Sequence, residues 1–204
     1  MSKIIRYLAL GDSYTIGELV PIYDSFPYQL VQLLRNHNPG GHSFLAPEIL
    51  AKTGWTTDEL LEGMANTTLL TEYDLVTLLI GVNNQYRGRT TENYLEEFTT
   101  IINKAISLAG NQPQKVIVFS IPDWGVTPFA AERDTMKIAE EIDAFNQICK
   151  DITLSSGCHH IDITGSQRID GNKEEYLATD KLHPSGKEYA KWAKELFFLF
   201  NRST

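Results

Sequence analysis

The sequence predicts an α/β fold, a flavodoxin-like three-layer α/β/α sandwich with a five-stranded parallel sheet in the order 2-1-3-4-5. Segments typical of strands alternate with segments of helical period along the whole chain. The runs LVTLLIG (75–81) and KVIVFSI (115–121) are almost continuously apolar, as parallel strands buried on both faces are. Five strands in 204 residues favour this order over a longer Rossmann sheet or a barrel. No repeat, low-complexity tract or linker divides the chain, so we expect one domain over residues 1–204.

Strands and helices are expected in turn. The expected strands are residues 3–10, 43–51, 74–80, 115–121 and 159–163. The expected helices are residues 26–34, 58–64, 92–109, 131–154 and 185–200. In the third helix, apolar residues recur every three or four positions, which is the period of one buried face: Leu95, Phe98, Ile102, Ile106 and Ala109. The last helix has a similar stripe, made of Tyr189, Ala193, Leu196 and Phe200.

Charge and composition disfavour several classes of partner. Lys and Arg number 18 against 26 Asp and Glu, a net charge of -8, whereas nucleic acids and anionic membranes reward basic clusters. The two cysteines, Cys149 and Cys158, have no metal-ligand spacing and are too few for a disulfide framework. The N-terminus shows no secretory signal, and no apolar run approaches the roughly 20 residues of a membrane span. We therefore expect a cytoplasmic protein that binds no nucleic acid and does not insert into a membrane.

Small and polar residues follow each of the first four expected strands. The stretch GDS (11–13) follows the first, KTGW (52–55) the second, GVNN (81–84) the third and PDWG (122–125) the fourth. Open parallel sheets bind ligands beyond the carboxyl ends of their strands, where the strand order reverses. In the expected order this crevice lies between the first and third strands, so we predict that Ser13 and Asn83 face each other across it.

A serine nucleophile needs a base, because its hydroxyl is weakly nucleophilic at its free pKa. Of the five histidines, His183 is the best placed: it lies in DKLHPS (180–185), where Pro184 disfavours helix at the preceding residue. Asp180, three residues earlier, is close enough for its carboxylate to orient the imidazole. The same stretch also predicts a helix start capped by Ser185, which is compatible with catalysis. Ser13 alone could equally be a turn residue and helix cap.

An oxyanion hole needs preorganised hydrogen-bond donors where negative charge develops. The candidate donors are the Ser13 N–H at a helix start, the Gly54 N–H and the side-chain amide of Asn83. Taken singly, the last two have simpler explanations, Gly54 as a turn glycine and Asn83 as a turn or cap residue.

Taken together, the four blocks around Ser13, Gly54, Asn83 and His183 resemble the SGNH (GDSL-type) hydrolase family, and they stand in the family's order over residues 11–184. The resemblance implies a serine esterase or acylhydrolase that cleaves carboxylic esters through an acyl-enzyme. It implies a catalytic triad of Ser13, Asp180 and His183. It also implies oxyanion contacts from Ser13, Gly54 and Asn83, with no metal and no organic cofactor.

Two positions depart from the family pattern. Tyr14 stands where the family often has Leu, and Asn84 stands where the asparagine block often reads G-x-N-D. Neither departure removes a catalytic group, although the loss of the acid at position 84 could alter how the loop is held or which substrate is preferred. Asp12 adjoins Ser13, but neighbours on a tight turn usually point apart. We therefore expect Asp12 to structure the turn and Asp180 to be the acid of the triad.

The sequence leaves the substrate open. Aromatic residues near the predicted crevice are candidate substrate contacts: Tyr14, Trp55, Tyr86, Trp124 and Phe129. Residues 121–129 are either an apolar wall of the site or a loop packed by its own aromatic rings. A small-molecule or lipid ester fits the chemistry, as do a sugar acetate, a thioester and a lysophospholipid. A non-catalytic phosphate-binding domain is disfavoured, because residues 11–17 (GDSYTIG) contain an acid and no Lys.

Overall fold

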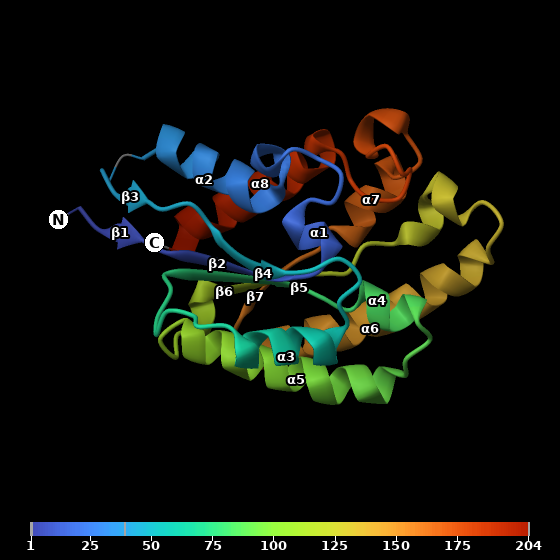
Figure 1. Cartoon of the computed structure of the whole chain (residues 1–204), viewed down its shortest axis with the longest axis horizontal. Coiled ribbons are helices and arrows are strands. Elements are labelled where there is room, and N and C mark those ends of the chain that lie inside the picture. Colours follow the sequence, from blue (N-terminus) through green and yellow to red (C-terminus); the bar gives the residue numbers. More distant parts are fainter. Residues whose placement is uncertain (1, 39, 204) are drawn as a thin grey trace.

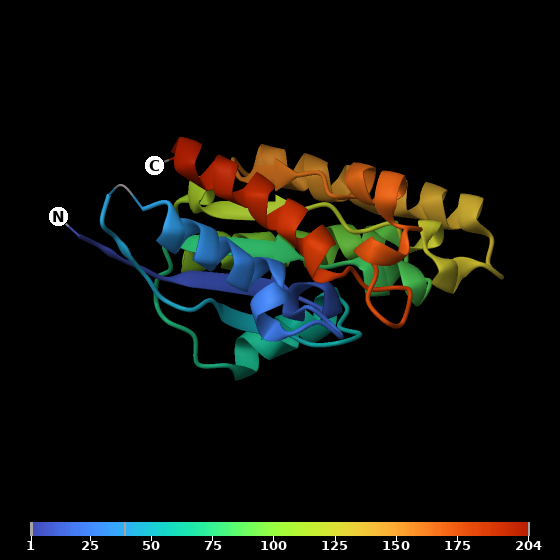
Figure 2. The same ribbon diagram turned by 90° about the horizontal axis from the view of Figure 1, so that it is seen from above.

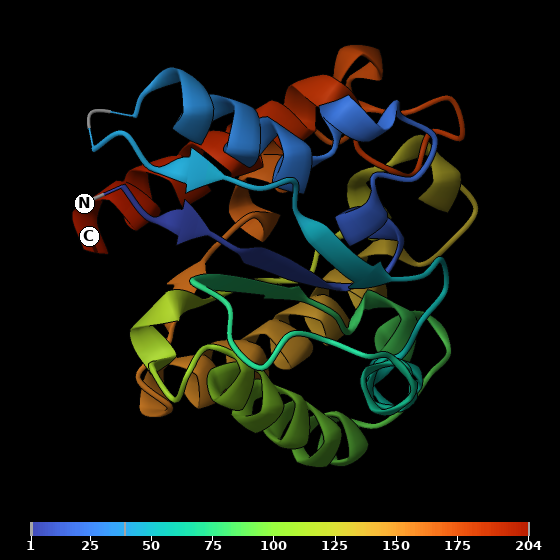
Figure 3. The ribbon, with the colours of Figure 1, turned by 60° about the vertical axis from the view of Figure 1, so that its left-hand side comes forward.

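The computed structural model describes residues 2–38 and 40–203. A parallel five-stranded sheet runs through its centre in the order β4-β2-β5-β6-β7 (Figures 1 and 3). Its strands are β2 (Tyr7–Gly11), β4 (Glu48–Ala51), β5 (Leu75–Leu79), β6 (Val116–Phe119) and β7 (His159–Ile161). Numbered along the chain, these five strands have the order 2-1-3-4-5, as the sequence predicts.

The three central strands are buried at every position, which explains their nearly continuous apolar sequences. The two edge strands, β4 and β7, are only partly buried. Gly11 at the end of β2 pairs with Ala51 of β4 on one side and with Leu79 of β5 on the other. The three strands therefore end at the same level, and the loops that follow them meet at one edge of the sheet.

Two of the expected strands are each divided in the structure. Their first parts, β1 (Ile4–Ile5) and β3 (Ser43–Phe44), pair with each other in a separate parallel sheet. Between β1 and β2, the Arg6 N–H donates to the Asp74 carboxylate at 2.9 Å. Between β3 and β4, Pro47 has no N–H to offer a neighbouring strand. The prediction of unbroken strands over residues 3–10 and 43–51 was therefore wrong at these two points.

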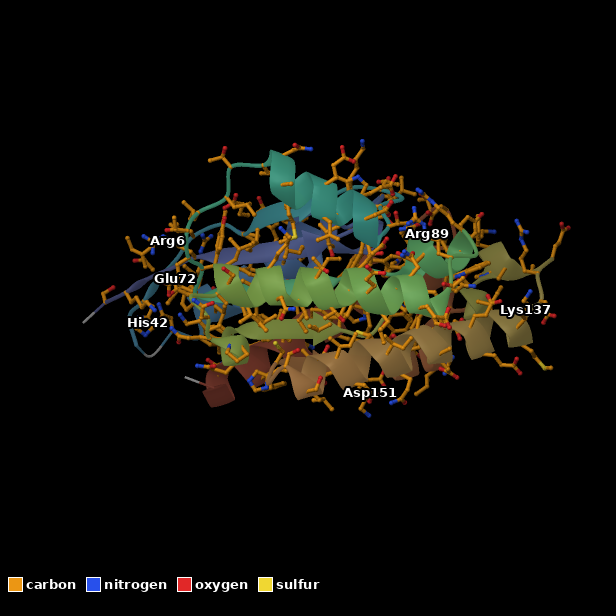
Figure 4. The ribbon with its side chains drawn as sticks, turned by 90° about the horizontal axis from the view of Figure 1, so that it is seen from below. Arg6, His42, Glu72, Arg89, Lys137 and Asp151 are labelled. Carbon is orange, nitrogen blue, oxygen red and sulfur yellow. The ribbon has the colours of Figure 1, made fainter. Side chains whose placement is uncertain are left out.

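Helices cover both faces of the sheet and give the predicted three layers (Figures 1 and 2). One face carries α2 (Phe26–Asn36) and α8 (Gly186–Ser203), which pack against each other. The other face carries α3 (Thr57–Asn66), α5 (Thr91–Leu108) and α6 (Thr135–Ser155), which lie in a row in Figure 4. Phe26 packs α2 against both the sheet and α8. Its ring centroid lies 5.0 Å from that of Phe119 on β6 and 6.1 Å from that of Trp192 on α8.

Two helices differ from the expectations. Helix α6 begins at Thr135 rather than at residue 131, because Pro128–Ala130 form a separate 3-10 turn and Asp134 caps α6 through its side chain. On α5, Leu95 is 49% exposed, whereas Tyr94 is fully buried. The buried face of α5 thus begins one residue earlier than predicted, and the prediction for Leu95 was wrong.

Three short helices each follow a strand, and of these only the helix start at Ser13 was expected. They are α1 (Ser13–Ile16), α4 (Val82–Tyr86) and α7 (Thr164–Asp170), and they are too short to display a hydrophobic period. Further 3-10 turns occur at Ile22–Asp24, Pro113–Lys115, Trp124–Val126 and Glu174–Tyr176. Within residues 2–38 and 40–203, no helix has both the length and the apolar character needed to cross a membrane.

Candidate active site

Ser13 lies at the junction of β2 and α1, where the chain turns sharply. Gly11 makes the turn possible, because a Cβ atom there would lie 2.1 Å from the Thr15 hydroxyl oxygen and 2.4 Å from the Leu79 carbonyl oxygen. Asp12 caps α1, since its Oδ1 atom accepts a hydrogen bond from the Tyr14 N–H at 3.0 Å. Ser13 is therefore fixed as the first residue of α1, with its side chain at the carboxyl edge of the sheet.

His183 and Asp180 lie together in the loop that joins α7 to α8. Asp180 Oδ1 accepts hydrogen bonds from the backbone N–H groups of Leu182 and His183, both at 3.0 Å. Asp180 Oδ2 lies 2.6 Å from His183 Nδ1. A backbone hydrogen bond closes this part of the loop, because the Ala178 N–H donates to the His183 carbonyl at 2.8 Å.

The loop brings His183 to Ser13, 170 positions earlier in the chain. His183 Nε2 lies 2.9 Å from Ser13 Oγ. A carboxylate at Nδ1 fixes the proton on that nitrogen, which leaves Nε2 as the acceptor of the serine hydroxyl proton. Burial raises the pKa of Asp180, but the hydrogen bonds from His183 and the two backbone N–H groups outweigh it and bring the pKa below its ordinary value. Asp180 is therefore an anion that can orient and stabilise the imidazole.

Two residues that line a pocket at this edge of the sheet, Ser13 and Gly54, have backbone N–H groups that make no hydrogen bond in the described part of the chain. Gly54 has a φ of 82°, a left-handed conformation that favours glycine. Unpaired N–H groups next to a serine hydroxyl provide the donors that an oxyanion requires.

The third predicted donor, the Asn83 amide, is already engaged. Asn83 Nδ2 donates to Asp12 Oδ2 at 3.2 Å and to the Trp55 carbonyl at 3.1 Å. Asp12 is fully buried, and burial raises its pKa to about 7 although the hydrogen bonds from Tyr14 and Asn83 favour the ionised form. The oxygens of Asp12 thus face Tyr14 and Asn83 rather than His183, as expected for a residue that structures the turn.

Beside Ser13 lies an open pocket with an empty volume of about 560 Å³, part of it open to solvent. It is lined by Ser13, Tyr14, Thr53, Gly54, Val82, Asn83, Tyr86, Trp124, Phe129, Leu182 and His183. Of the five aromatic residues proposed as substrate contacts, only Trp55 is missing from this lining. A Cβ atom on Gly63 would lie 2.4 Å from the Trp55 ring, so this ring packs on α3 instead. Thr53, Val82 and Leu182 were not predicted, although each adjoins a predicted site residue.

Comparison with known proteins supplies the family. The model of the GDSL-like lipase/acylhydrolase family matches residues 9–191. The chain belongs to this family. No curated protein matches it significantly. Among solved structures, it is similar to the lipase/acylhydrolase from Enterococcus faecalis, with 20% identity, a TM-score of 0.72, and coverage of 100% of this chain and 96% of that one.

Two other solved structures share the fold of this GDSL-family chain. TesA has 14% identity and a TM-score of 0.75, with 98% of this chain and 99% of that chain covered. The acetyl xylan esterase AlAXEase has 15% identity and a TM-score of 0.74, with 95% of this chain and 98% of that chain covered. At such identities the likeness establishes the fold, and the chain is an ester-bond hydrolase by its family.

The loop after β6 was expected either to wall the pocket or to pack on itself, and in this GDSL-family chain it does both. The Trp124 ring lies 5.3 Å from Tyr86 and 6.1 Å from Phe129, measured between centroids, and all three line the pocket. Trp124 is fixed from behind, because its Nε1–H donates to Gln85 Oε1 at 2.8 Å. Phe129 is 44% exposed at the pocket rim, and its N–H donates to the Lys181 carbonyl at 3.3 Å.

Asn84, which replaces the acid common in the GDSL family, joins α4 to α3. Its Oδ1 atom accepts from the Thr57 N–H at 3.1 Å, and its Nδ2–H donates to the Thr57 hydroxyl at 2.6 Å. The Thr57 hydroxyl in turn donates to the Glu97 carboxylate on α5. An amide at position 84 therefore suits a threonine whose hydroxyl proton is already given to another carboxylate.

No metal-binding cluster accompanies this site. In the part of the chain that the structure describes, no group of three or more His, Cys, Asp or Glu residues is arranged to hold a metal ion. Both cysteines are buried and unpaired.

Proposed function

We propose that this GDSL-family hydrolase is a serine esterase or acylhydrolase that cleaves carboxylic esters through an acyl-enzyme on Ser13. The observation that carries the proposal is the unbroken hydrogen-bond path from Asp180 through His183 to Ser13 Oγ, which ends in a pocket with two unpaired N–H donors. Neither a turn residue nor a helix cap accounts for a serine that donates to a carboxylate-oriented imidazole.

In the first half of the proposed reaction, Ser13 Oγ attacks the ester carbonyl carbon while His183 Nε2 takes the hydroxyl proton. The Ser13 and Gly54 N–H groups donate to the resulting oxyanion. The Asn83 amide joins them by sharing a hydrogen now given to Trp55 or Asp12. His183 then gives its proton to the leaving alcohol, which departs as the carbonyl re-forms on the acyl-enzyme.

In the second half, His183 removes a proton from water, and the hydroxide attacks the acyl carbon of the Ser13 ester. The same donors hold the second oxyanion, and its collapse releases the carboxylic acid and returns the proton to Ser13. Asp180 stays ionised throughout and stabilises the imidazolium.

The pocket supports an uncharged acyl group of modest size. Apart from His183, its lining has no ionisable group other than two tyrosines, and its walls are the rings of Tyr14, Tyr86, Trp124 and Phe129 with Val82 and Leu182. Burying a charged group against such walls without a partner would be costly. Sugar acetates, thioesters and lysophospholipids share this chemistry and remain alternative substrates. Sugar acetates have the further support that one structural neighbour is an acetyl xylan esterase.

The test is hydrolysis of p-nitrophenyl esters from acetate to long acyl chains by the wild type, Ser13→Ala and the control Ser155→Ala. Ser155 lies at the end of α6 and is exposed. We expect activity that peaks at a short or medium chain, persists in the control and disappears in Ser13→Ala. Equal activity in all three proteins would reject Ser13 as the nucleophile.

A further inference from the structure

Arg87 binds the backbone of the loop that contains Gly54 (residues 52–55), from outside the pocket. It follows directly after α4, and its Nη2 donates to the Gly54 carbonyl at 2.5 Å. Its other terminal nitrogen, Nη1, lies 3.3 Å from Glu59 Oε2 on α3. Within the described ranges, and leaving aside Gly54 itself and its two neighbours in the chain, the guanidinium is also the only group within 4 Å of the position that a Gly54 Cβ would occupy, at 3.4 Å. Arg87 does not line the pocket.

The backbone of Gly54 depends on such a hydrogen bond more than the backbone of another residue would. Glycine has the widest choice of φ and ψ, so its flanking peptide planes rotate readily unless something holds them. The residues beside it are held: the Thr53 hydroxyl donates to the Glu18 carboxylate, and the Trp55 carbonyl accepts from Asn83. Within residues 2–38 and 40–203, Arg87 provides the one hydrogen bond to the Gly54 carbonyl.

The arginine is itself anchored to a fixed point. Glu59 Oε2 also accepts from the Thr56 N–H at 2.9 Å, in the capping box that starts α3. Arg87 therefore connects the end of α4, the Gly54 peptide and the first turn of α3. A planar guanidinium suits this place, because it offers several donors in one rigid group.

We propose that Arg87 is a positioning residue for the oxyanion hole: by holding the Gly54 carbonyl it restrains the backbone rotation at Gly54, on which the direction of the Gly54 N–H depends. The inference rests on the function proposed above, in which that N–H binds the oxyanion. Without Arg87 the Gly54–Trp55 peptide keeps, among the described residues, only the hydrogen bond from the Trp55 N–H to the Lys52 carbonyl, at 3.1 Å. The backbone at Gly54 then has more freedom, and its N–H is held less firmly toward the developing charge. Substrate binding depends on the apolar walls, and Arg87 is not among the residues that line them, so the effect falls on the transition state.

The test compares Arg87→Met with Arg89→Met, a matched control two residues along the chain. Arg89 binds Asp58 on α3, at 2.9 Å and 3.0 Å through its two terminal nitrogens (Figure 4). In the described structure it makes no hydrogen bond or ion pair with residues 52–55. The readouts are kcat and KM for p-nitrophenyl butyrate and the inhibition constant of butylboronic acid, which forms a tetrahedral adduct on a serine nucleophile.

We expect Arg87→Met to lower kcat roughly 10- to 100-fold, with KM within about twofold of wild type. This loss does not exceed the roughly 100- to 1000-fold loss of kcat that follows deletion of an oxyanion donor. Boronate inhibition should weaken in the same proportion. Arg87→Lys keeps one charged donor and should recover part of the loss. Arg89→Met should leave kcat and boronate inhibition at wild-type values. Melting curves of all variants check that each one is folded.

Each other outcome is decisive. If the wild type is active through Ser13 but Arg87→Met and Arg87→Lys behave like Arg89→Met, the positioning role of Arg87 is rejected while the proposed function stands. If KM rises and kcat is unchanged, Arg87 acts in substrate binding and the inference is also rejected. If the wild type has no Ser13-dependent activity, both proposals fail together.

Discussion

The fully buried Asp12, next to Ser13 in the chain, and the partly buried Asn83 are joined by a hydrogen bond, in which Asn83 Nδ2 donates to Asp12 Oδ2 at 3.2 Å. The other carboxylate oxygen of Asp12 accepts from the Tyr14 N–H in the first turn of α1. One side chain thus holds both the helix that carries the proposed nucleophile and the amide proposed to bind the oxyanion. Asp12 is the D of the GDSL motif, and its contacts show that it fixes the positions of α1 and Asn83.

Replacing Asp12 by Asn should remove a pH-dependent component of stability. An aspartate in an unfolded chain titrates near pH 3.9, whereas Asp12 in the fold has a pKa of about 7. Between about pH 4 and pH 7 the folded protein therefore binds more protons than the unfolded chain, so the free energy of unfolding due to Asp12 falls as pH rises. The Tm of Asp12→Asn minus that of the wild type should become more positive from pH 5 to pH 8. A difference that is constant or becomes more negative would contradict the burial of a titrating Asp12.

Asp180→Asn should abolish most of the activity while preserving the loop. The Asn oxygen can still accept from the two backbone N–H groups that now bind Asp180 Oδ1. Its amide N–H would face His183 Nδ1 and favour the tautomer with the proton on Nε2, which cannot accept the Ser13 proton. We expect kcat to fall by roughly 10⁴. Asp134→Asn, at the cap of α6, serves as the control, and an equal and small effect of both changes would remove Asp180 from the triad.

Phe129→Ala should move the preferred acyl chain to a greater length. Phe129 is half exposed at the pocket rim, so its truncation widens the pocket without opening the core. Trp55→Phe is the contrasting change, because the Trp55 ring packs on Gly63 and does not line the pocket. The ratio of kcat/KM for p-nitrophenyl octanoate over butyrate reports the shift. A larger ratio in Trp55→Phe than in Phe129→Ala would mean that the acyl group lies elsewhere.

Asn84→Asp, which restores the common family residue, should destabilise this chain. The Thr57 hydroxyl would then face two carboxylates, the introduced one at position 84 and that of Glu97, and it can donate to only one of them. An unsatisfied buried acceptor costs about 1–3 kcal/mol, which urea unfolding can measure. Glu97→Gln in the same protein should recover part of the loss. If the double variant were as unstable as the sum of the two single ones, Asn84 and Glu97 would not be coupled.

The sheet and much of the site could be predicted because both depend on short-range patterns. The apolar runs of β5 and β6 indicate strands buried on two faces, and the small residues after each strand indicate the edge where a ligand binds. The spacing from Asp180 to His183 is within one loop, so their pairing is almost a local property. The pairing of His183 with Ser13 was expected because a serine nucleophile needs a base, together with the resemblance to the SGNH family.

Other features depend on contacts between distant segments that leave no local pattern. The side of α3 on which Trp55 packs is decided by Gly63, and the buried face of α5 is shifted because Tyr94 rather than Leu95 packs against the sheet. The grip of Arg87 on the Gly54 carbonyl joins residues 33 positions apart. In the sequence Arg87 is an ordinary charged residue after a short helix. Its partner is a backbone carbonyl, and because every residue has one, the sequence gives no sign of this contact.

The central claim is that Ser13 is the nucleophile, and covalent labelling tests it most directly. The protein is treated with diethyl p-nitrophenyl phosphate, which phosphorylates serine nucleophiles activated by a neighbouring base, and the labelled peptide is mapped by mass spectrometry. We predict a single diethylphosphoryl group on Ser13, formed in step with the loss of esterase activity and absent from His183→Ala. A label on another residue that accompanies inactivation, or full activity after Ser13 is labelled, would contradict the account.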